Sequence, residues 1–457
     1  MAKARSAKRT VSFGEFFENL TERGLSLFKA RAQPEGLTPD LVLLGEALLS
    51  RRGEASGVAL AEALVEAYDQ ANNEQRLDFL KVLASRFGVD REAVLSVVAA
   101  LGLPQADDNV FEELHRIAEP RRQELMRRLN LAPGGTAALV RMREGLLRHL
   151  PESPELRGLD ADFAHLFNSW FNRGFLELRH IGWETPASIL EKIIRYEAVH
   201  EIHNWEDLRN RLQPKDRRCY GFFHPQLVDE PLIFVEVALT SEIPDKIGPL
   251  LNVQREPIEA EDATTAVFYS ISNTQRGLAG VSFGNFLIKQ VVENLKSELP
   301  NIKTFVTLSP IPGFSRWLEN ERRDEKSAVV DAEQRQRLSA LDNALWYEDQ
   351  SMVKDVEQVL MPLARYYFLS ARDKKNRPLD SVARFHLGNG ARLERLNFMA
   401  DLSPNGMRQS YGMMVNYQYD LGQIEKNHEA FLERGEIAAQ AELRKLHSPF
   451  QAHAAVG

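Results

Sequence analysis

A glycine-rich segment offers the strongest local sign of chemistry in the sequence. The stretch NTQRGLAGVSFG (273–284) places Gly277, Gly280 and Gly284 between an apolar run and a helical pattern. Glycines allow tight turns and close approach of a ligand, and free N–H groups at a helix start favour phosphate. Arg276 can add a charge-assisted contact. The spacing matches neither the P-loop nor the dinucleotide fingerprint, so a glycine-rich turn that only feeds a packed helix is an equal alternative.

The second candidate is Ser309, at the start of SPIPGFSRWL (309–318). The nearby prolines stiffen the backbone where an apolar run ends. In an open α/β sheet, ligands bind beyond the carboxyl ends of the strands, where the glycine-rich segment also ends. A serine in an ordinary strand-end turn is the competing interpretation, and for a serine taken alone it is the stronger one.

The third candidate is His386 in FHLGNG (385–390), which we expect in an apolar strand before a tight turn. A histidine in such a setting is more often a hydrogen-bonded core residue than a catalyst. A contact with Ser309 would let the pair transfer protons near neutral pH. The sequence alone does not show that contact.

Metal ligation and thiol chemistry find less support. Glu197, His200 and His203 place ligand types on one face of a predicted helix, but the second Glu-x-x-His helix of a di-iron bundle is missing. Cys219 is the one cysteine, which excludes an internal disulfide and a cysteine-rich metal cage. We therefore expect no metal and no other cofactor.

The elements that must position these residues form a βαβ unit. Nearly continuous apolar runs predict strands at 231–240, 265–272 and 304–310. Apolar residues at four-residue steps predict a helix over 281–299, so the strands on either side of it should be parallel. The segment 384–399 reads as two strands joined by a turn at 388–390.

The first 150 residues show only helical periodicity, with Gly and Pro between the apolar stretches. Pro151 and Pro154 mark a boundary, because two prolines in four residues stop a helix. We therefore predict an α+β protein of two domains: a helical bundle over 1–153 and a mixed-sheet domain over 154–457. A charged stretch at 316–346 lacks strand character and predicts a helical surface insertion.

Charge and hydropathy exclude several functional classes. The net charge of −8 makes the chain a poor general nucleic-acid binder, so an anionic ligand must be held by local groups. No apolar run reaches the roughly 18 residues of a membrane span. The N-terminus lacks the apolar core of a secretory signal, and its basic stretch is short for a transit peptide. We expect a cytoplasmic protein.

Long motifs give the sequence a family resemblance. They lie at 166–202, 217–240, 266–292, 305–318, 384–403 and 411–419, and include RRCYGFFHPQLVDEPLIFVEVALT, FVTLSPIPGFSRWL and YGMMVNYQY. In the same order, these segments strongly resemble malonyl-CoA decarboxylase over about residues 155–425. The N-terminal helices fit the helical domain of that family in kind, although their sequence is less specific.

The resemblance implies a fold, a site and partners. The catalytic domain would have a GNAT-like fold, and the helical domain would serve self-association as a dimer or tetramer. Ser309, His386 and Tyr419 match the catalytic serine, histidine and active-site tyrosine. The loop that grips the CoA ester would contain Gln275, Arg276, Ala279, Gly280, Val281, Ser282, Phe283, Gly284 and Asn285. Some relatives carry an acidic residue where this chain has Ser282, so a carboxylate role does not transfer there.

The implied reaction converts malonyl-CoA to acetyl-CoA and CO2, and needs neither metal, biotin nor pyridoxal phosphate because the thioester itself accepts the electron pair. It requires stabilisation of the developing enolate and a proton donor at carbon. Ser309 and His386 would form the proton-transferring pair, and the sequence does not decide which of them protonates carbon. A CoA-dependent acyltransferase and a non-catalytic CoA-binding protein are the alternatives.

Overall fold

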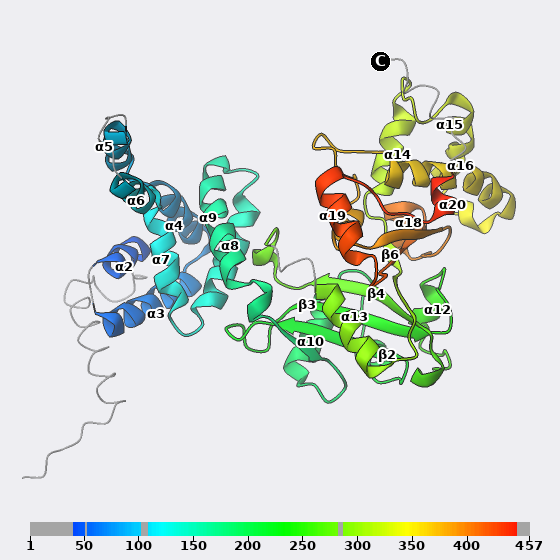
Figure 1. Cartoon of the computed structure of the whole chain (residues 1–457), viewed down its shortest axis with the longest axis horizontal. Helices are drawn as coiled ribbons and strands as arrows, with labels where there is room; N and C mark the ends of the chain where they lie inside the picture. Colours follow the sequence, from blue (N-terminus) through cyan, green and yellow to red (C-terminus); the bar gives the residue numbers. More distant parts are fainter. Residues whose placement is uncertain (1–39, 51–52, 102–107, 282–286, 446–457) are drawn as a thin grey trace, which may run out of the picture. The chain divides into compact units, whose positions relative to one another are not determined.

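The computed structural model describes residues 40–50, 53–101, 108–281 and 287–445 (Figure 1). Its contacts divide the chain into two compact units. The first contains the residues up to Phe175 together with His224–Val228 and Gln275–Phe283. The second contains Leu176–Phe223, Asp229–Thr274 and Gly284–Gly457. Two short segments from the sheet-forming part of the sequence thus belong to the first unit by their contacts.

The first unit is helical, as the periodicity predicts. Apolar side chains at three- and four-residue steps, such as Leu125, Met126 and Leu129, turn inward and are buried between helices. Its helices are α2 (Leu41–Leu49), α3 (Glu54–Gln70), α4 (Asn73–Ser85), α5 (Arg91–Leu101), α6 (Asp108–Ala118), α7 (Arg121–Asn130), α8 (Gly135–His149) and α9 (Arg157–Trp170).

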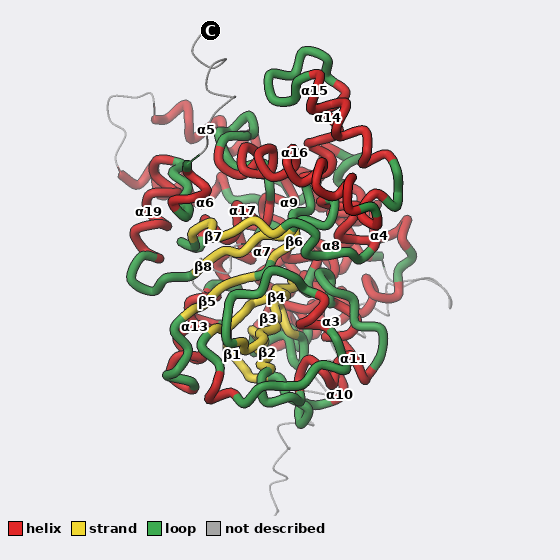
Figure 2. Tube along the Cα trace, turned by 90° about the vertical axis from the view of Figure 1, so that its right-hand side faces the viewer, coloured by secondary structure: helices red, strands yellow, loops and turns green. Residues whose placement is uncertain are grey.

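The second unit is built on an eight-stranded mixed sheet, whose strands are yellow in Figure 2. The strand order is β1-β2-β3-β4-β5-β8-β6, with β7 also paired to β8. The strands are β1 (Glu177–His180), β2 (Arg217–Phe223), β3 (Pro231–Thr240), β4 (Thr265–Asn273), β5 (Thr304–Thr307), β6 (Ser309–Pro310), β7 (Arg392–Asn397) and β8 (Met414–Gln418). This confirms the predicted fold class, a helical N-terminal region followed by a mixed-sheet domain.

The described residues of the second unit also form helices. They are α10 (Ala187–Tyr196), α11 (Trp205–Leu212), α12 (Gly248–Leu251), α13 (Leu287–Glu298), α14 (Phe314–Arg323), α15 (Ala332–Leu338), α16 (Gln350–Leu369), α17 (Ser381–Gly388), α18 (Pro404–Ser410), α19 (Ile424–Arg434) and α20 (Ala441–Arg444). The charged stretch at 316–346 contains α15 and parts of α14, as predicted. In the described parts of the chain, no helix combines the length and the apolar character needed to cross a membrane.

The predicted βαβ unit is present. β4 and β5 pair in parallel, with Thr265 opposite Thr304, and α13 connects them. β3 on the other side of β4 is antiparallel. The predicted strand at 304–310 is interrupted at Leu308, after which β6 pairs with β8 through Ser309 and Val415. Because β8 pairs with both β5 and β6, the serine stays beside β8 after the pairing of β5 with β4 has ended.

The predicted strand around His386 is wrong. These residues form the helix α17, whose start is capped by the Asp380 side chain accepting from the Ala383 N–H at 2.9 Å. A short apolar run such as FHL cannot distinguish helix from strand by periodicity, and here the N-cap decides. The predicted second strand is β7.

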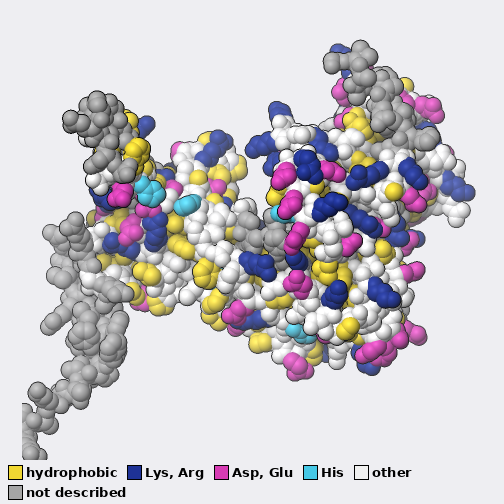
Figure 3. Space-filling model, in the orientation of Figure 1, with side chains coloured by type: hydrophobic (Ala, Val, Ile, Leu, Met, Phe, Trp, Pro, Cys, Tyr) yellow, Lys and Arg dark blue, Asp and Glu magenta, His cyan; other side chains and the backbone are white. Residues whose placement is uncertain are grey.

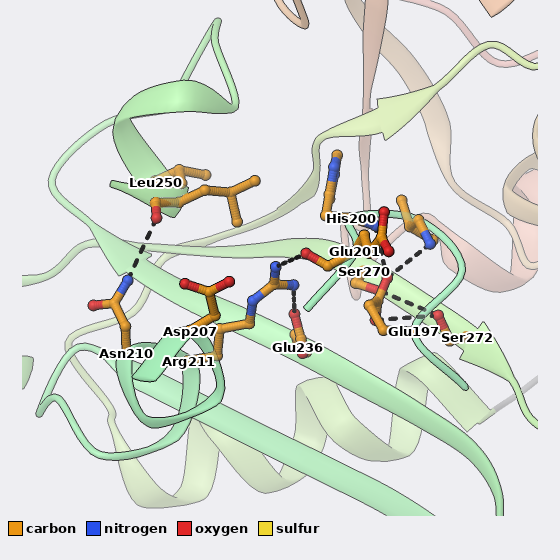
Figure 4. Close-up of polar contacts among 12 residues, drawn as sticks. Glu197, His200, Glu201, Asp207, Asn210, Arg211, Glu236, Leu250, Ser270 and Ser272 are labelled. Carbon is orange, nitrogen blue, oxygen red and sulfur yellow. Dashed lines mark hydrogen bonds and ion pairs between the residues drawn. The ribbon is translucent and has the colours of Figure 1, made fainter. Parts of the chain in front are cut away.

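The predicted helix face carrying Glu197 and His200 is also wrong. Helix α10 ends at Tyr196, and the Glu197 carboxylate accepts from the hydroxyls of Ser270 and Ser272 on β4, at 2.7 and 3.3 Å (Figure 4). The same carboxylate accepts from the His200 N–H, which replaces a helical carbonyl. Among the described residues, no three His, Cys, Asp or Glu side chains are grouped to hold a metal ion.

Candidate active site

Ser309 lies on a strand that is buried in the second unit. Its side chain is 6% exposed, and its Oγ donates to Thr307 Oγ1 at 2.9 Å. The Tyr417 N–H donates to the same Thr307 oxygen at 3.1 Å. The neighbouring strands therefore fix the serine hydroxyl rather than leaving it free to rotate.

His386 reaches Ser309 from helix α17. Its Nε2 lies 3.3 Å from Ser309 Oγ, and its Nδ1 lies 2.7 Å from the hydroxyl oxygen of Tyr419. Its ring also stacks on Tyr417, with centroids 4.6 Å apart. The structure therefore brings together residues that are 77 positions apart in the chain.

Burial sets the protonation of this histidine. The ring is 3% exposed, and the loss of solvation lowers the His386 pKa to about 3. Burial also raises the pKa of Tyr419 well above its usual value, so its hydroxyl keeps its proton. At neutral pH the imidazole is therefore uncharged and carries one N–H, which faces either Ser309 or Tyr419.

Tyr419 directly follows β8, and its own N–H donates to the Phe305 carbonyl on β5 at 2.9 Å. This bond anchors the residue to the strand that leads toward Ser309. Ser309, His386 and Tyr419 thus form one hydrogen-bonded chain in the second unit, which we call the hydroxyl–imidazole chain.

Sequence reasoning missed Thr307 and Tyr417. Each lies two positions before a predicted site residue, Ser309 and Tyr419 respectively. Side chains two positions apart in an extended segment point to the same face, so this spacing could have identified both.

The glycine-rich segment has a buried and an exposed side. Gly277, Leu278 and Val281 are buried in the first unit, whereas Arg276 and Gly280 are exposed. Gly280 has a φ of +75°, which glycine adopts without strain, and a Cβ built there would meet nothing within 4 Å. Its backbone is thus open to a ligand. Gln275 is half-buried and Ala279 is exposed, and the predicted Ser282, Phe283, Gly284 and Asn285 lie outside the described residues.

Two family models match the chain. The malonyl-CoA decarboxylase C-terminal domain matches residues 174–456, and the malonyl-CoA decarboxylase N-terminal domain matches residues 87–171. The chain belongs to the malonyl-CoA decarboxylase family. The match to the N-terminal domain covers residues 87–171, part of the helical region in which the sequence resemblance was less specific.

Other members of the malonyl-CoA decarboxylase family agree in sequence and structure. The mitochondrial malonyl-CoA decarboxylase of Anser anser anser is 37% identical over 413 residues, covering 82% of this chain and 81% of that one. That of Mus musculus is 35% identical over 417 residues, covering 83% of each. The crystal structures of the enzymes from Rhodopseudomonas palustris and Agrobacterium vitis give TM-scores of 0.87 and 0.85, at 61% and 54% identity. Each covers 90% of this chain and 100% of the other.

Proposed function

We propose that this protein decarboxylates malonyl-CoA to acetyl-CoA and CO2. The observation that carries the proposal is the hydroxyl–imidazole chain in a member of this family. Ser309, His386 and Tyr419 are linked at 3.3 and 2.7 Å in a buried site. Such a chain can donate a proton to carbon without exposing the intermediate to bulk water.

The reaction breaks the bond between the malonyl carboxylate carbon and Cα. The electron pair of that bond moves into the thioester to give an enolate, and CO2 leaves. A proton added at Cα then yields acetyl-CoA, and water restores the proton to the protein. The thioester accepts the electrons, so the residues need to stabilise the enolate oxygen and supply the proton.

The hydrogen bonds favour Ser309 as the group that gives the proton to Cα, with His386 replacing the serine proton. Because the Ser309 hydroxyl donates to Thr307, its lone pairs are free to accept from the His386 Nε2–H. Tyr419, which keeps its own proton, would donate to Nδ1 and hold this tautomer. In this arrangement Ser309 would give its hydroxyl proton to Cα and take the Nε2 proton of His386 in its place. The imidazole would then take the Tyr419 proton at Nδ1, and water would reprotonate Tyr419.

The loop from Gln275 to Asn285 would hold the CoA ester. The exposed Gly280 backbone and Arg276 support this role, since the net charge of −8 does not attract a polyanion globally. On the face shown in Figure 3, acidic and basic side chains are interspersed, so attraction must come from local groups.

Purified protein incubated with malonyl-CoA alone tests the proposal. We expect acetyl-CoA and CO2 without any acceptor, and the same rate with a chelator present. Turnover that begins only when an amine or hydroxyl acceptor is added would show an acyltransferase instead. The variants Ser309→Ala and His386→Asn should each lower kcat by about 10²- to 10³-fold. If both keep full activity, the site assignment is wrong.

The helical region would support self-association with a second copy of the chain. Leu95 and Val98 on α5 and Phe111 on α6 are large apolar side chains that are exposed in the single chain. Light scattering should give a dimer or tetramer. The double variant Leu95→Lys and Phe111→Lys should lower the mass, and a wild-type monomer at all concentrations would reject this role.

A further inference from the structure

The loop that follows β4 is fastened to helix α8 by a buried arginine. Arg143 is 3% exposed, and its Nη1 donates to the Gly277 carbonyl at 2.9 Å. Both residues belong to the first unit. Gly277 lies in the 3-10 turn Arg276–Leu278, directly before the exposed Ala279 and Gly280. The bond therefore fixes the buried side of the turn whose other side is open.

The guanidinium is itself held in place. Arg143 Nε donates to Asp160 Oδ1 on α9 at 2.8 Å, and the guanidinium carbon lies 6.0 Å from the centre of the Phe167 ring. A planar guanidinium can donate in two fixed directions at once, here to a carboxylate and to a carbonyl. Helices α8 and α9 thus orient the group that binds the loop.

Gly277 shows how closely the loop approaches the helix. A Cβ built at this position would lie 2.0 Å from the Val140 carbonyl oxygen on α8. Any larger residue would therefore push the turn away from the helix. Leu278 and Val281 are buried beside it, at 3% and 7% exposure, and give the loop an apolar anchor.

We infer that Arg143 is a positioning residue for the CoA-binding loop, and that the helical unit sets the conformation in which the loop meets the CoA ester. The inference rests on the proposed CoA-binding role of that loop. Arg143 touches the turn on its buried side, away from the exposed Arg276 and Gly280. It would act by preorganising the backbone rather than by contacting the substrate, which reduces the ordering cost of binding.

Replacing Arg143 by lysine tests this role against a closely matched control. Arg122 on α7 is also buried, also pairs with an aspartate of α9 (Asp162), and also donates to a carbonyl, that of Ala84 at 2.9 Å. That carbonyl belongs to α4, not to the loop. Lysine keeps the charge in both variants but cannot donate in two fixed directions.

The measurements are the Kd of CoA by calorimetry, and KM and kcat for malonyl-CoA. We expect Arg143→Lys to raise Kd and KM about tenfold, with kcat within about twofold, as for the loss of one charge-assisted hydrogen bond. Arg122→Lys should leave Kd and KM within about twofold even if it lowers the melting temperature equally. Equal shifts of Kd in the two variants would overturn the inference.

Gly277→Ala provides a second variant that leaves the Arg143 side chain intact. It should raise the Kd of CoA while kcat is largely kept, because the hydroxyl–imidazole chain lies in the other unit. An unchanged Kd in a folded Gly277→Ala protein would contradict the inference. If the wild type binds CoA but releases no CO2, the decarboxylase proposal fails while the comparison of Arg143→Lys with Arg122→Lys still decides this one.

Discussion

Burial, more than any charged neighbour, determines what His386 can do. Loss of solvation is the cause of its lowered pKa, and the ring meets two hydroxyl groups, those of Ser309 and Tyr419. A neutral imidazole between two hydroxyl groups has a defined tautomer only if one of those hydroxyls always donates its hydrogen bond to the ring. Tyr419 can be that donor because its own pKa is raised.

Replacing Tyr419 by phenylalanine should therefore damage catalysis but not binding. Without the hydroxyl, Nδ1 has no donor and the Nε2–H tautomer is no longer favoured. We expect kcat to fall by about 10- to 100-fold, which corresponds to one buried hydrogen bond, with KM within about twofold. Tyr220→Phe is the matched control, since Tyr220 lies on β2 and its hydroxyl donates to Glu298 at the end of α13. Equal losses in the two variants would argue against a tautomer role.

The pH profile of kcat tests the protonation state directly. Because the His386 pKa is lowered to about 3, acidification from pH 8 to pH 5 should not protonate the ring. Because the pKa of Tyr419 is raised, the tyrosine should not lose its proton on the alkaline side of the kcat profile either. We expect kcat at saturating malonyl-CoA to be flat from about pH 5 to about pH 9. An acid limb with a midpoint near 6.5, the ordinary histidine value, would contradict this.

Ser309, His386 and Tyr419 could be predicted from the sequence, but only through the long motifs of the family resemblance. Taken singly, a serine after a strand or a histidine in an apolar run is more often structural. The contact between Ser309 and His386 depends on how α17 packs against the sheet, and no local pattern encodes that. Thr307 and Tyr417 could have been predicted, because the two-residue spacing places their side chains on the same face as Ser309 and Tyr419.

Helix α17 is the element on which the site depends most. It has eight residues and presents His386 from its last turn. Isolated helices of this length are marginal, so its start must be fixed by the cap. The buried carboxylate of Asp380 provides that cap through the Ala383 N–H.

Removing this cap should lower both stability and activity. We expect Asp380→Ala to cost about 1 to 2 kcal/mol of unfolding free energy and to reduce kcat severalfold, because the helix carrying His386 loosens. Asp380→Asn retains an acceptor oxygen and should be close to wild type in kcat. Asp331→Ala removes the corresponding cap of α15 and should leave kcat unchanged. Urea unfolding and steady-state kinetics measure the two effects, and full activity in Asp380→Ala would reject the dependence.

At this scale the long elements were predictable and the short ones were not. The βαβ unit of β4, α13 and β5 follows from apolar runs of sufficient length around a helical period. Helix α17 was predicted as a strand because its apolar run is too short to show a period. The end of α10 was missed because Glu197 uses its side chain to replace a helical carbonyl.

The pH dependence of stability reports on the whole second unit. His386 takes up a proton near pH 6.5 when unfolded but only near pH 3 when folded, so acid stabilises the unfolded chain. From pH 7 to pH 5, the wild type should lose about 2 kcal/mol more unfolding free energy than His386→Asn. Urea unfolding can be followed by the fluorescence of the tryptophans in that unit, Trp183, Trp205, Trp317 and Trp346.

The exposed His165 provides the control for this comparison. His165→Asn makes the same chemical change at an exposed position of the first unit, so it tests whether the effect comes from the His-to-Asn change itself. Comparing variants cancels the contributions of other groups, among them Glu236, whose pKa burial raises to about 7 and which therefore acts in the opposite direction. Identical pH dependence in the wild type and His386→Asn would show that His386 is not neutral in the folded state.

The contact between Gly277 and α8 restricts how this family can recombine. The turn fits only a helix whose Val140 carbonyl and Arg143 lie where they do here. A chimera that joins the N-terminal half of one relative to the sheet-forming half of another at Pro151–Pro154 would pair a loop with a foreign helix. Productive crossovers should therefore exchange residues 135–149 and 275–281 together, so these two separate stretches are inherited as one module.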